Sequence, residues 1–137
     1  AMQALYGRAK DWGYQLKYDF DRCAFEYTYE YEGQRSQISY ISMDDPSGRF
    51  IRFTSPCLDI SKKSKSKLSD KDRRKLLIMN NDAAMHCRFA IDSANEQLVL
   101  ITDQLSRTMD KEEFDYQLRE VAEAADSFEK ELGLDRY

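Results

Sequence analysis

Residues 69–81 read SDKDRRKLLIMNN, residues 87–102 read CRFAIDSANEQLVLIT, and residues 110–132 read DKEEFDYQLREVAEAADSFEKEL. The first and third segments repeat apolar residues every three or four positions, which is typical of helices that bury one face. The middle segment carries alternating residues on both sides of a polar turn, which is typical of a β-hairpin. Together the three segments predict one continuous helix–hairpin–helix unit.

The two helices of this unit have clear starting signals. Ser69 and Asp70 open the first, whose apolar stripe is predicted to be Leu76, Leu77 and Met79. In the second, Asp110 with Glu113 three residues later resembles a capping box. Its predicted buried face follows helical spacing until Gly133 ends the helix, and consists of Phe114, Leu118, Val121, Ala122, Ala125, Phe128 and Leu132.

The first half of the chain predicts a helix and three strands. Residues 3–18 have helical spacing at Leu5, Ala9, Trp12 and Leu16. Strands are expected over 25–31, 36–43 and 49–55, and Pro56 either ends the third strand or leaves it at a sheet edge. The predicted order is α-β-β-β-α-β-β-α, an α+β fold in which helices pack on an antiparallel sheet.

The length of 137 residues suits a single domain spanning 1–137, with a flexible lysine- and serine-rich loop at about 58–68. No apolar run reaches the ~20 residues that a membrane-spanning helix needs, so we expect a cytoplasmic protein without membrane contact. The three cysteines lack C-x-x-C spacing, which argues against a disulfide framework or a zinc site. We expect no metal and no cofactor.

Charge is strongly segregated along the chain, although the net charge is only −4. Residues 61–75 are basic and residues 110–137 are acidic. The basic run supplies a candidate contact surface of Lys62, Lys63, Lys65 and Lys67. We favour the interpretation of this run as a solvated, flexible loop, and a contact with the acidic helix 110–131 of a second copy is the alternative. We expect no nucleic-acid binding, because the chain is acidic and the run contains no aromatic residue for stacking.

A tyrosine-rich strand is the best binding candidate. Phe25, Tyr27, Tyr29 and Tyr31 alternate with polar residues, and tyrosine is favoured at protein interfaces. The alternative is the core face of a sheet, which we favour for Phe25 and Tyr27. Tyr29 and Tyr31 fit both interpretations, since they approach the end of the hairpin.

No residue set forms a catalytic signature. His86 is the only histidine, and its neighbour Cys87 would point to the opposite face of a strand, so the two do not form a nucleophilic pair. The sequence contains no P-loop, dinucleotide-binding glycine pattern, G-x-S-x-G or H-E-x-x-H motif. We therefore expect a protein that is not an enzyme.

The predicted order and the run 76–81 resemble the class I type III secretion chaperone-like fold, which is shared with bacterial sensory-transduction regulator families. The resemblance covers Leu5 to Leu132. Its most specific part is the run 76–81, a Leu-Leu helix ending near an asparagine (Asn80 or Asn81), followed by strand residues Phe89 and Ile91, then 98–100 and the long final helix. It implies a homodimer that binds an unfolded segment of a partner protein on apolar grooves and sheet edges. The implied contact residues are Trp12, Leu16, Tyr27, Tyr29 and Tyr31.

Two functions follow as expectations. The first is a chaperone-like module that holds a partner segment by apolar contacts and strand addition. The second is a small regulatory or adaptor protein that binds a folded partner through its charged surfaces. Apolar binding should survive high salt, whereas charge-driven binding should weaken as ionic strength rises.

Overall fold

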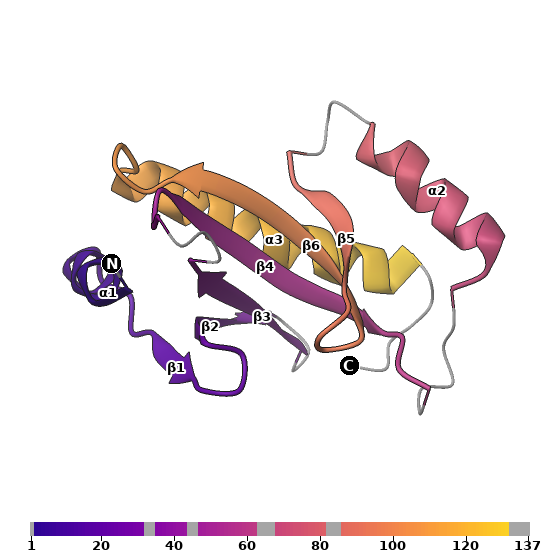
Figure 1. The fold of residues 1–137 in the computed structure, drawn as a ribbon, viewed down its shortest axis with the longest axis horizontal. Helices are drawn as coiled ribbons and strands as arrows, with labels where there is room; N and C mark the ends of the chain where they lie inside the picture. The colour runs from indigo at the N-terminus through magenta and orange to yellow at the C-terminus, as the bar shows by residue number, and fades with distance from the viewer. Residues whose placement is uncertain (1, 32–34, 44–46, 63–67, 82–85, 132–137) are drawn as a thin grey trace.

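The fold was analysed in a computed structural model that describes residues 2–31, 35–43, 47–62, 68–81 and 86–131. These residues form three helices and six strands. In chain order they are α1 (Met2–Asp11), β1 (Lys17–Asp19), β2 (Ala24–Tyr31), β3 (Arg35–Ser42), β4 (Phe50–Asp59), α2 (Asp70–Asn80), β5 (Arg88–Asp92), β6 (Gln97–Leu105) and α3 (Lys111–Glu131). The predicted α+β fold with an antiparallel sheet is confirmed (Figure 1).

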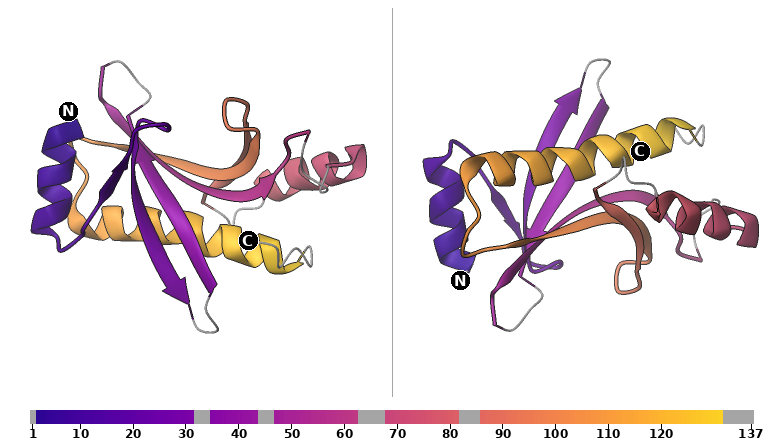
Figure 2. Two further views of the ribbon diagram at one scale, coloured as in Figure 1. Left: turned by 90° about the horizontal axis from the view of Figure 1, so that it is seen from below. Right: turned by 90° about the horizontal axis from the view of Figure 1, so that it is seen from above.

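The six strands form one sheet in the order β1-β2-β3-β4-β6-β5, and every neighbouring pair is antiparallel. Helix α3 runs along one face of this sheet, as the two views of Figure 2 show. The core lies between them because α3 turns a continuous apolar face toward the strands. That face was predicted correctly: the buried residues are Phe114, Leu118, Val121, Ala122, Ala125 and Phe128, while Leu132 lies outside the described residues.

The first helix is shorter than the sequence pattern predicted. It ends at Asp11, and Gly13 follows with a φ of 93°. The Gly13 N–H donates to the Lys10 carbonyl at 3.0 Å and the Tyr14 N–H to the Ala9 carbonyl at 2.9 Å, which is the hydrogen-bond pattern of a Schellman helix end. The prediction of a helix to residue 18 is wrong because glycine adopts this left-handed conformation without steric cost.

Pro56 does not end the third predicted strand, since β4 continues to Asp59 and pairs Pro56 with Val99 of β6. The Pro56 carbonyl accepts a hydrogen bond from Gln37 Nε2 at 2.7 Å, on the side facing β3. The N–H and C=O of one strand residue point to the same side of the strand. The N–H that Pro56 lacks would therefore have pointed toward β3. There the β3–β4 ladder, which spans Arg52 to Thr54 on β4, has already stopped.

Helix α2 begins as predicted and ends on a strand edge. Ser69 and Asp72 form a capping box at its start. At its end, Asn80 Oδ1 accepts from the Phe89 N–H at 2.7 Å and Asn80 Nδ2 donates to the Phe89 carbonyl at 3.2 Å. Phe89 pairs with Leu100 of β6 on its other side, so Asn80 occupies the outer edge of β5. Of the two asparagines in the resemblance, Asn80 forms these hydrogen bonds to the hairpin.

We expect Asn80→Ala to lower the free energy of unfolding by about 2 kcal/mol, because both main-chain groups of Phe89 lose a half-buried partner. The matched control is Asn81→Ala, whose side chain is exposed one residue later. It should change stability by no more than ~0.5 kcal/mol. Urea unfolding followed by circular dichroism measures both, and equal losses in the two variants would contradict the role of Asn80.

Candidate protein-binding surfaces

Among the described residues, no strand pairs with the outer edge of β2 from Tyr27 to Glu30. Strand β1 is three residues long and pairs only with Ala24, Phe25 and Glu26. From Tyr27 to Glu30, β2 pairs with β3 on its inner side, and no described strand lies on its outer side. Unpaired main-chain groups on such an edge are a template for an added strand.

The predicted tyrosines follow this open edge but contribute largely to packing. Tyr27 and Tyr29 are half-buried, with ring centroids 4.9 Å apart. Tyr14, from the segment after α1, packs on Tyr27 at 5.1 Å and its hydroxyl donates a short hydrogen bond to Asp115 of α3. Burial raises the pKa of Tyr14 and Tyr29 well above the ordinary value, so both phenols stay neutral. Tyr31 is half-buried at the hairpin end of the strand.

The other two predicted contact residues, Trp12 and Leu16, also pack against the core. Trp12 is half-buried with its ring 5.3 Å from that of Phe114, and the Arg8 guanidinium lies over it at 5.2 Å. Leu16 is only 8% exposed, so little of its side chain is available to a partner. Their role in partner binding stays a prediction.

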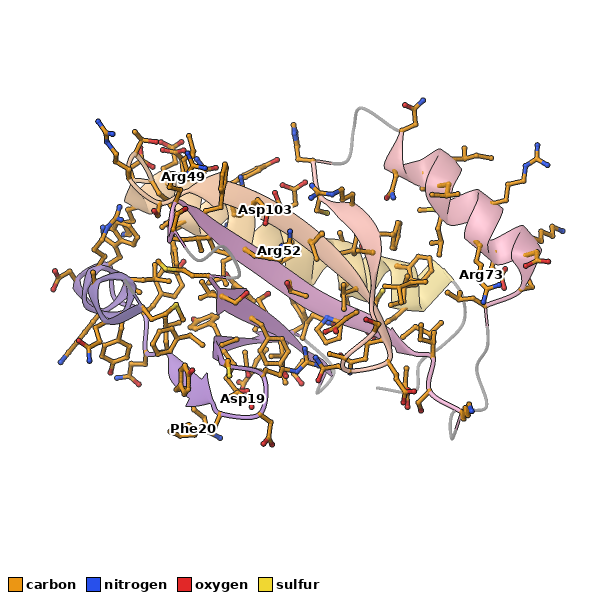
Figure 3. The ribbon with its side chains drawn as sticks, in the orientation of Figure 1. Asp19, Phe20, Arg49, Arg52, Arg73 and Asp103 are labelled. Carbon is orange, nitrogen blue, oxygen red and sulfur yellow. The ribbon has the colours of Figure 1, made fainter. Side chains whose placement is uncertain are left out.

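An aromatic patch near β1 was missed by the sequence analysis. Phe20 is 82% exposed in the turn after β1, and Figure 3 shows it at the margin of the molecule. Its ring packs on Tyr18 at 4.9 Å, and Tyr18 packs on Phe25 at 5.2 Å. Tyr6 of α1 stacks on the same Phe25 at 5.4 Å. The one available signal was a phenylalanine within the polar run Asp19–Arg22.

A second exposed apolar surface lies where α2 meets β5. A groove of about 330 Å³ is lined mainly by apolar side chains there, among them Leu76, Leu77 and Ile91. Leu77 is 71% exposed and Ile91 is 56% exposed, with Ile78 of α2 also at 65%. We call Leu77, Ile78 and Ile91 the α2–β5 surface.

This surface corrects the apolar stripe predicted for α2. Leu76 is buried and Met79 packs against the core, as predicted, but Leu77 points outward. Successive residues of an α-helix are rotated by about 100°. Leu77 therefore points away from the side on which Leu76 and Met79 pack against the core. The third inward position is Asn80, which binds the edge of β5.

The predicted lysine surface is only partly described. Lys62 is exposed, whereas Lys63, Lys65 and Lys67 lie outside the described residues. Exposed basic side chains continue along α2 at Lys71, Arg73, Arg74 and Lys75. Arg73 pairs with Asp70 at 3.1 Å.

His86 and Cys87 do not form a nucleophilic pair. Cys87 is buried and His86 exposed, and burial raises the pKa of the Cys87 thiol to about 11, so it is protonated at neutral pH. In the described ranges, no three His, Cys, Asp or Glu side chains gather closely enough to hold a metal ion. Nor does any helix in those ranges have the length and apolar character to cross a membrane.

Comparison with known proteins gives similarity in structure only. No protein-family model matches the chain, and no curated protein matches its sequence.

Three solved structures illustrate the likeness. A chain of the HopA1–SchA chaperone–effector complex superposes with a TM-score of 0.61 and 8% identity, over 94% of this chain and 92% of that one. For the ExsC–ExsE complex the TM-score is 0.58 at 15% identity, over 93% and 90%. For the Yersinia pestis type III secretion chaperone SycH with a fragment of YscM2 it is 0.57 at 10% identity, over 91% and 96%. The chain therefore has the type III secretion chaperone-like fold.

Proposed function

We propose that this protein is a non-enzymatic, chaperone-like module that holds an extended segment of a partner polypeptide. The outer edge of β2 from Tyr27 to Glu30, along which no described strand pairs, carries the proposal. An added strand would satisfy main-chain groups along this edge, as in other cases of strand addition. The structural neighbours include a chaperone bound to its effector and a chaperone bound to a protein fragment, which supports a protein partner.

The aromatic patch gives the partner segment an apolar anchor at β1, next to the paired half of β2. Phe20 and Tyr6 are exposed. Phe20 packs on Tyr18, which packs on Phe25, and Tyr6 stacks directly on Phe25. Rigid aromatic side chains lose little conformational entropy when a partner covers them. The strand edge would supply affinity independent of sequence, and the aromatic patch would select segments with apolar side chains.

We also propose a homodimer formed through the α2–β5 surface. Leu77 and Ile91 line one groove, and Ile78 is exposed next to Leu77 on α2. Exposed apolar groups of this kind mark interaction sites. The same surface on a second copy is apolar as well, so a two-fold contact would place apolar groups against apolar groups. The β2 edge lies at the opposite end of the sheet order and would stay accessible in such a dimer.

The alternative function is an adaptor that binds a folded partner through charge. It is favoured by the exposed basic side chains of Lys62, Lys71, Arg74 and Lys75. Salt separates the two functions, because the Debye length falls to about 3 Å at 1 M ionic strength. Partner binding through strand addition and aromatic contacts should persist there, whereas binding through the basic side chains should not.

We expect the tagged protein to retain one stoichiometric partner from an extract of its source organism in about 1 M salt, a concentration at which exposed charges are screened. The double variant Phe20→Ser/Tyr31→Ser should retain at least about tenfold less, equivalent to ~1.4 kcal/mol. Tyr116→Ser is the matched control, since Tyr116 is an exposed tyrosine of α3 away from the β2 edge. Mass spectrometry identifies and quantifies the partner.

Two results would count against this function. Loss of the partner in high salt from the wild-type protein would favour the adaptor. Equal retention by the double variant and by Tyr116→Ser would show that the partner binds elsewhere than the β2 edge and the aromatic patch.

A further inference from the structure

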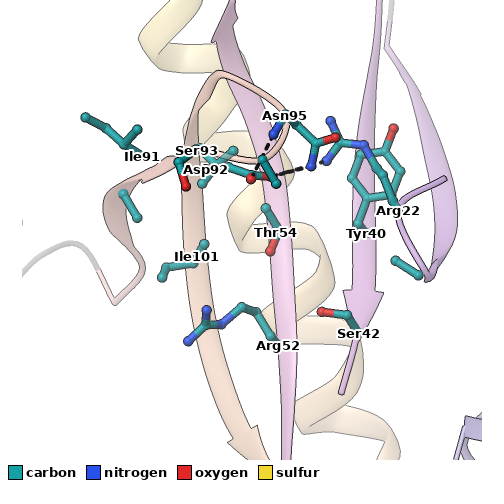
Figure 4. A pocket seen from close by; sticks show the side chains of 14 residues that line it. Arg22, Tyr40, Ser42, Arg52, Thr54, Ile91, Asp92, Ser93, Asn95 and Ile101 are labelled. Carbon is teal, nitrogen blue, oxygen red and sulfur yellow. Dashed lines mark hydrogen bonds and ion pairs between the residues drawn. The ribbon is translucent and has the colours of Figure 1, made fainter. Parts of the chain in front are cut away.

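A separate cavity lies on the sheet face opposite α3. It has a volume of about 380 Å³, at the lower end of the range for small-molecule pockets. Figure 4 shows Tyr40 and Arg22 on one side, Ile91 and Ile101 on the other, and Thr54 between them. The β5–β6 turn closes one end of the cavity, so its lining comes from five strands and two turns.

Arg22 is held over this cavity by its own turn. The Asp19 carboxylate accepts hydrogen bonds from the N–H groups of Asp21 at 3.0 Å and Arg22 at 3.1 Å. Cys23 follows with a φ of 52°, a left-handed conformation that reverses the chain into β2. The guanidinium then lies over the Tyr40 ring, 4.1 Å from its centroid, and the Arg22 side chain is 14% exposed.

The hydrogen-bonding capacity of this guanidinium is mostly unused. Among the described residues, Arg22 Nη2 donates one hydrogen bond, to Gln97 Oε1. Arg22 Nη1 is 3.9 Å from the Asp92 carboxylate, which is beyond hydrogen-bond distance. That carboxylate instead accepts from the Asn95 N–H at 3.2 Å and from Asn95 Nδ2 at 2.7 Å. A guanidinium has five N–H donors, so Arg22 presents donors to the cavity.

The rest of the lining adds hydroxyl groups and apolar surface. Burial raises the pKa of Tyr40 above its ordinary value, so its hydroxyl is protonated at neutral pH and can donate. Ser42 and Thr54 contribute further hydroxyls. The apolar surface comes from Ala24, Ala90, Val99 and Ile101. At the open end of the cavity, the Arg52 guanidinium forms an ion pair with the Asp103 carboxylate at 2.9 Å.

We propose that this cavity binds a small organic acid, whose carboxylate would pair with Arg22 while its short apolar or hydroxylated body packs against Thr54, Val99 and Ile101. A planar guanidinium fixed on an aromatic ring matches a carboxylate in shape and charge. One guanidinium, with Asp92 close by, neutralises a monoanion better than a phosphate dianion. Ile91 belongs to both this cavity and the α2–β5 surface, whereas Arg22, Tyr40 and Thr54 line the cavity alone. The proposal does not depend on the function proposed for the protein-binding surfaces.

The test uses 3-methylbutanoate as probe and its neutral amide, 3-methylbutanamide, as the matched ligand. We expect saturable binding of the acid in calorimetry, with the amide at least about tenfold weaker, or ~1.4 kcal/mol. Amide NMR shifts of the wild-type protein should change most at residues 92–95 and Tyr40. Arg22→Gln should weaken binding at least about tenfold. Arg107→Gln, which removes the same charge from an exposed turn, should leave binding unchanged.

If Arg22→Gln unfolds, the amide shifts of the wild-type protein still test the site. Arg22→Lys keeps the positive charge but lacks the planar guanidinium group. Equal binding of acid and amide would overturn the proposal, as would shifts away from the cavity. Tighter binding of inorganic phosphate would overturn the choice of a monoanion. Binding only of glutamate blocked at both its amino and α-carboxyl groups would overturn the small-molecule ligand and assign the cavity to an acidic side chain of a polypeptide.

Discussion

Phe114→Ala is expected to lower the free energy of unfolding by about 4 kcal/mol, the largest effect we predict for a single substitution. The Phe114 side chain is completely buried at the start of α3. Its ring centroid lies 5.0 Å from that of Tyr14, 5.3 Å from Trp12 and 5.6 Å from Phe53. Alanine keeps the helix but leaves a cavity where three segments of the chain meet, and the surrounding rings can fill it only in part.

Chemical unfolding followed by circular dichroism measures this loss. The control is Tyr116→Ala on the same helix, because its side chain is exposed and it should keep nearly all of the stability. If Phe114→Ala were no less stable than Tyr116→Ala, the packing of the segment after α1 against α3 would be incorrect. A loss of cooperativity without a shift in midpoint would indicate that the segment after α1 unfolds separately.

Leu77→Asp is expected to raise the dissociation constant of the homodimer at least about 100-fold, equivalent to ~2.8 kcal/mol. A carboxylate in an apolar contact loses its hydration without gaining a partner. Leu77 is mostly exposed in the single chain, so the substitution should leave the folded monomer intact. Sedimentation velocity over a range of protein concentrations measures the dimer, and circular dichroism checks the fold.

Ser127→Asp is the matched control, since it adds the same charge on an exposed position of α3. It should dimerise like the wild-type protein. A Leu77→Asp protein that dimerises equally well would place the contact elsewhere than the α2–β5 surface. A wild-type protein that stays monomeric at all concentrations would remove the homodimer from the proposed function.

The fold was predictable because local patterns of residues determine most of its elements. The buried face of α3 follows helical spacing over its whole length, and the capping box of Asp110 and Glu113 forms, with the Glu113 N–H donating to Asp110 at 2.8 Å. The first helix was overextended because Trp12 and Leu16 continue the spacing of the helix while Gly13 breaks its backbone. Helical spacing of apolar residues indicates which residues are buried. A buried residue that follows the end of a helix can continue the same spacing without being helical.

The candidate sites were less predictable because they depend on contacts between distant segments. Arg22 donates a hydrogen bond to Gln97, which is 75 residues further along the chain. No local sequence pattern indicates this contact. Phe20 is exposed in the turn that follows the short strand β1. The tyrosine row was found from its alternation, but alternation could not show that Tyr14 packs on Tyr27 and donates a hydrogen bond to Asp115 of α3.

The hydrogen bonds of Asn80 to Phe89 also bear on polymer growth. Proteins that join edge to edge form open chains of sheets only when each unit offers two free edges, one to accept and one to pass on the contact. Here Asn80 occupies the outer main-chain groups of β5 at Phe89, while β2 at the other end of the sheet is open. A strand that adds at β2 meets a unit whose far edge is already occupied at Phe89, which works against propagation of the sheet into a fibre.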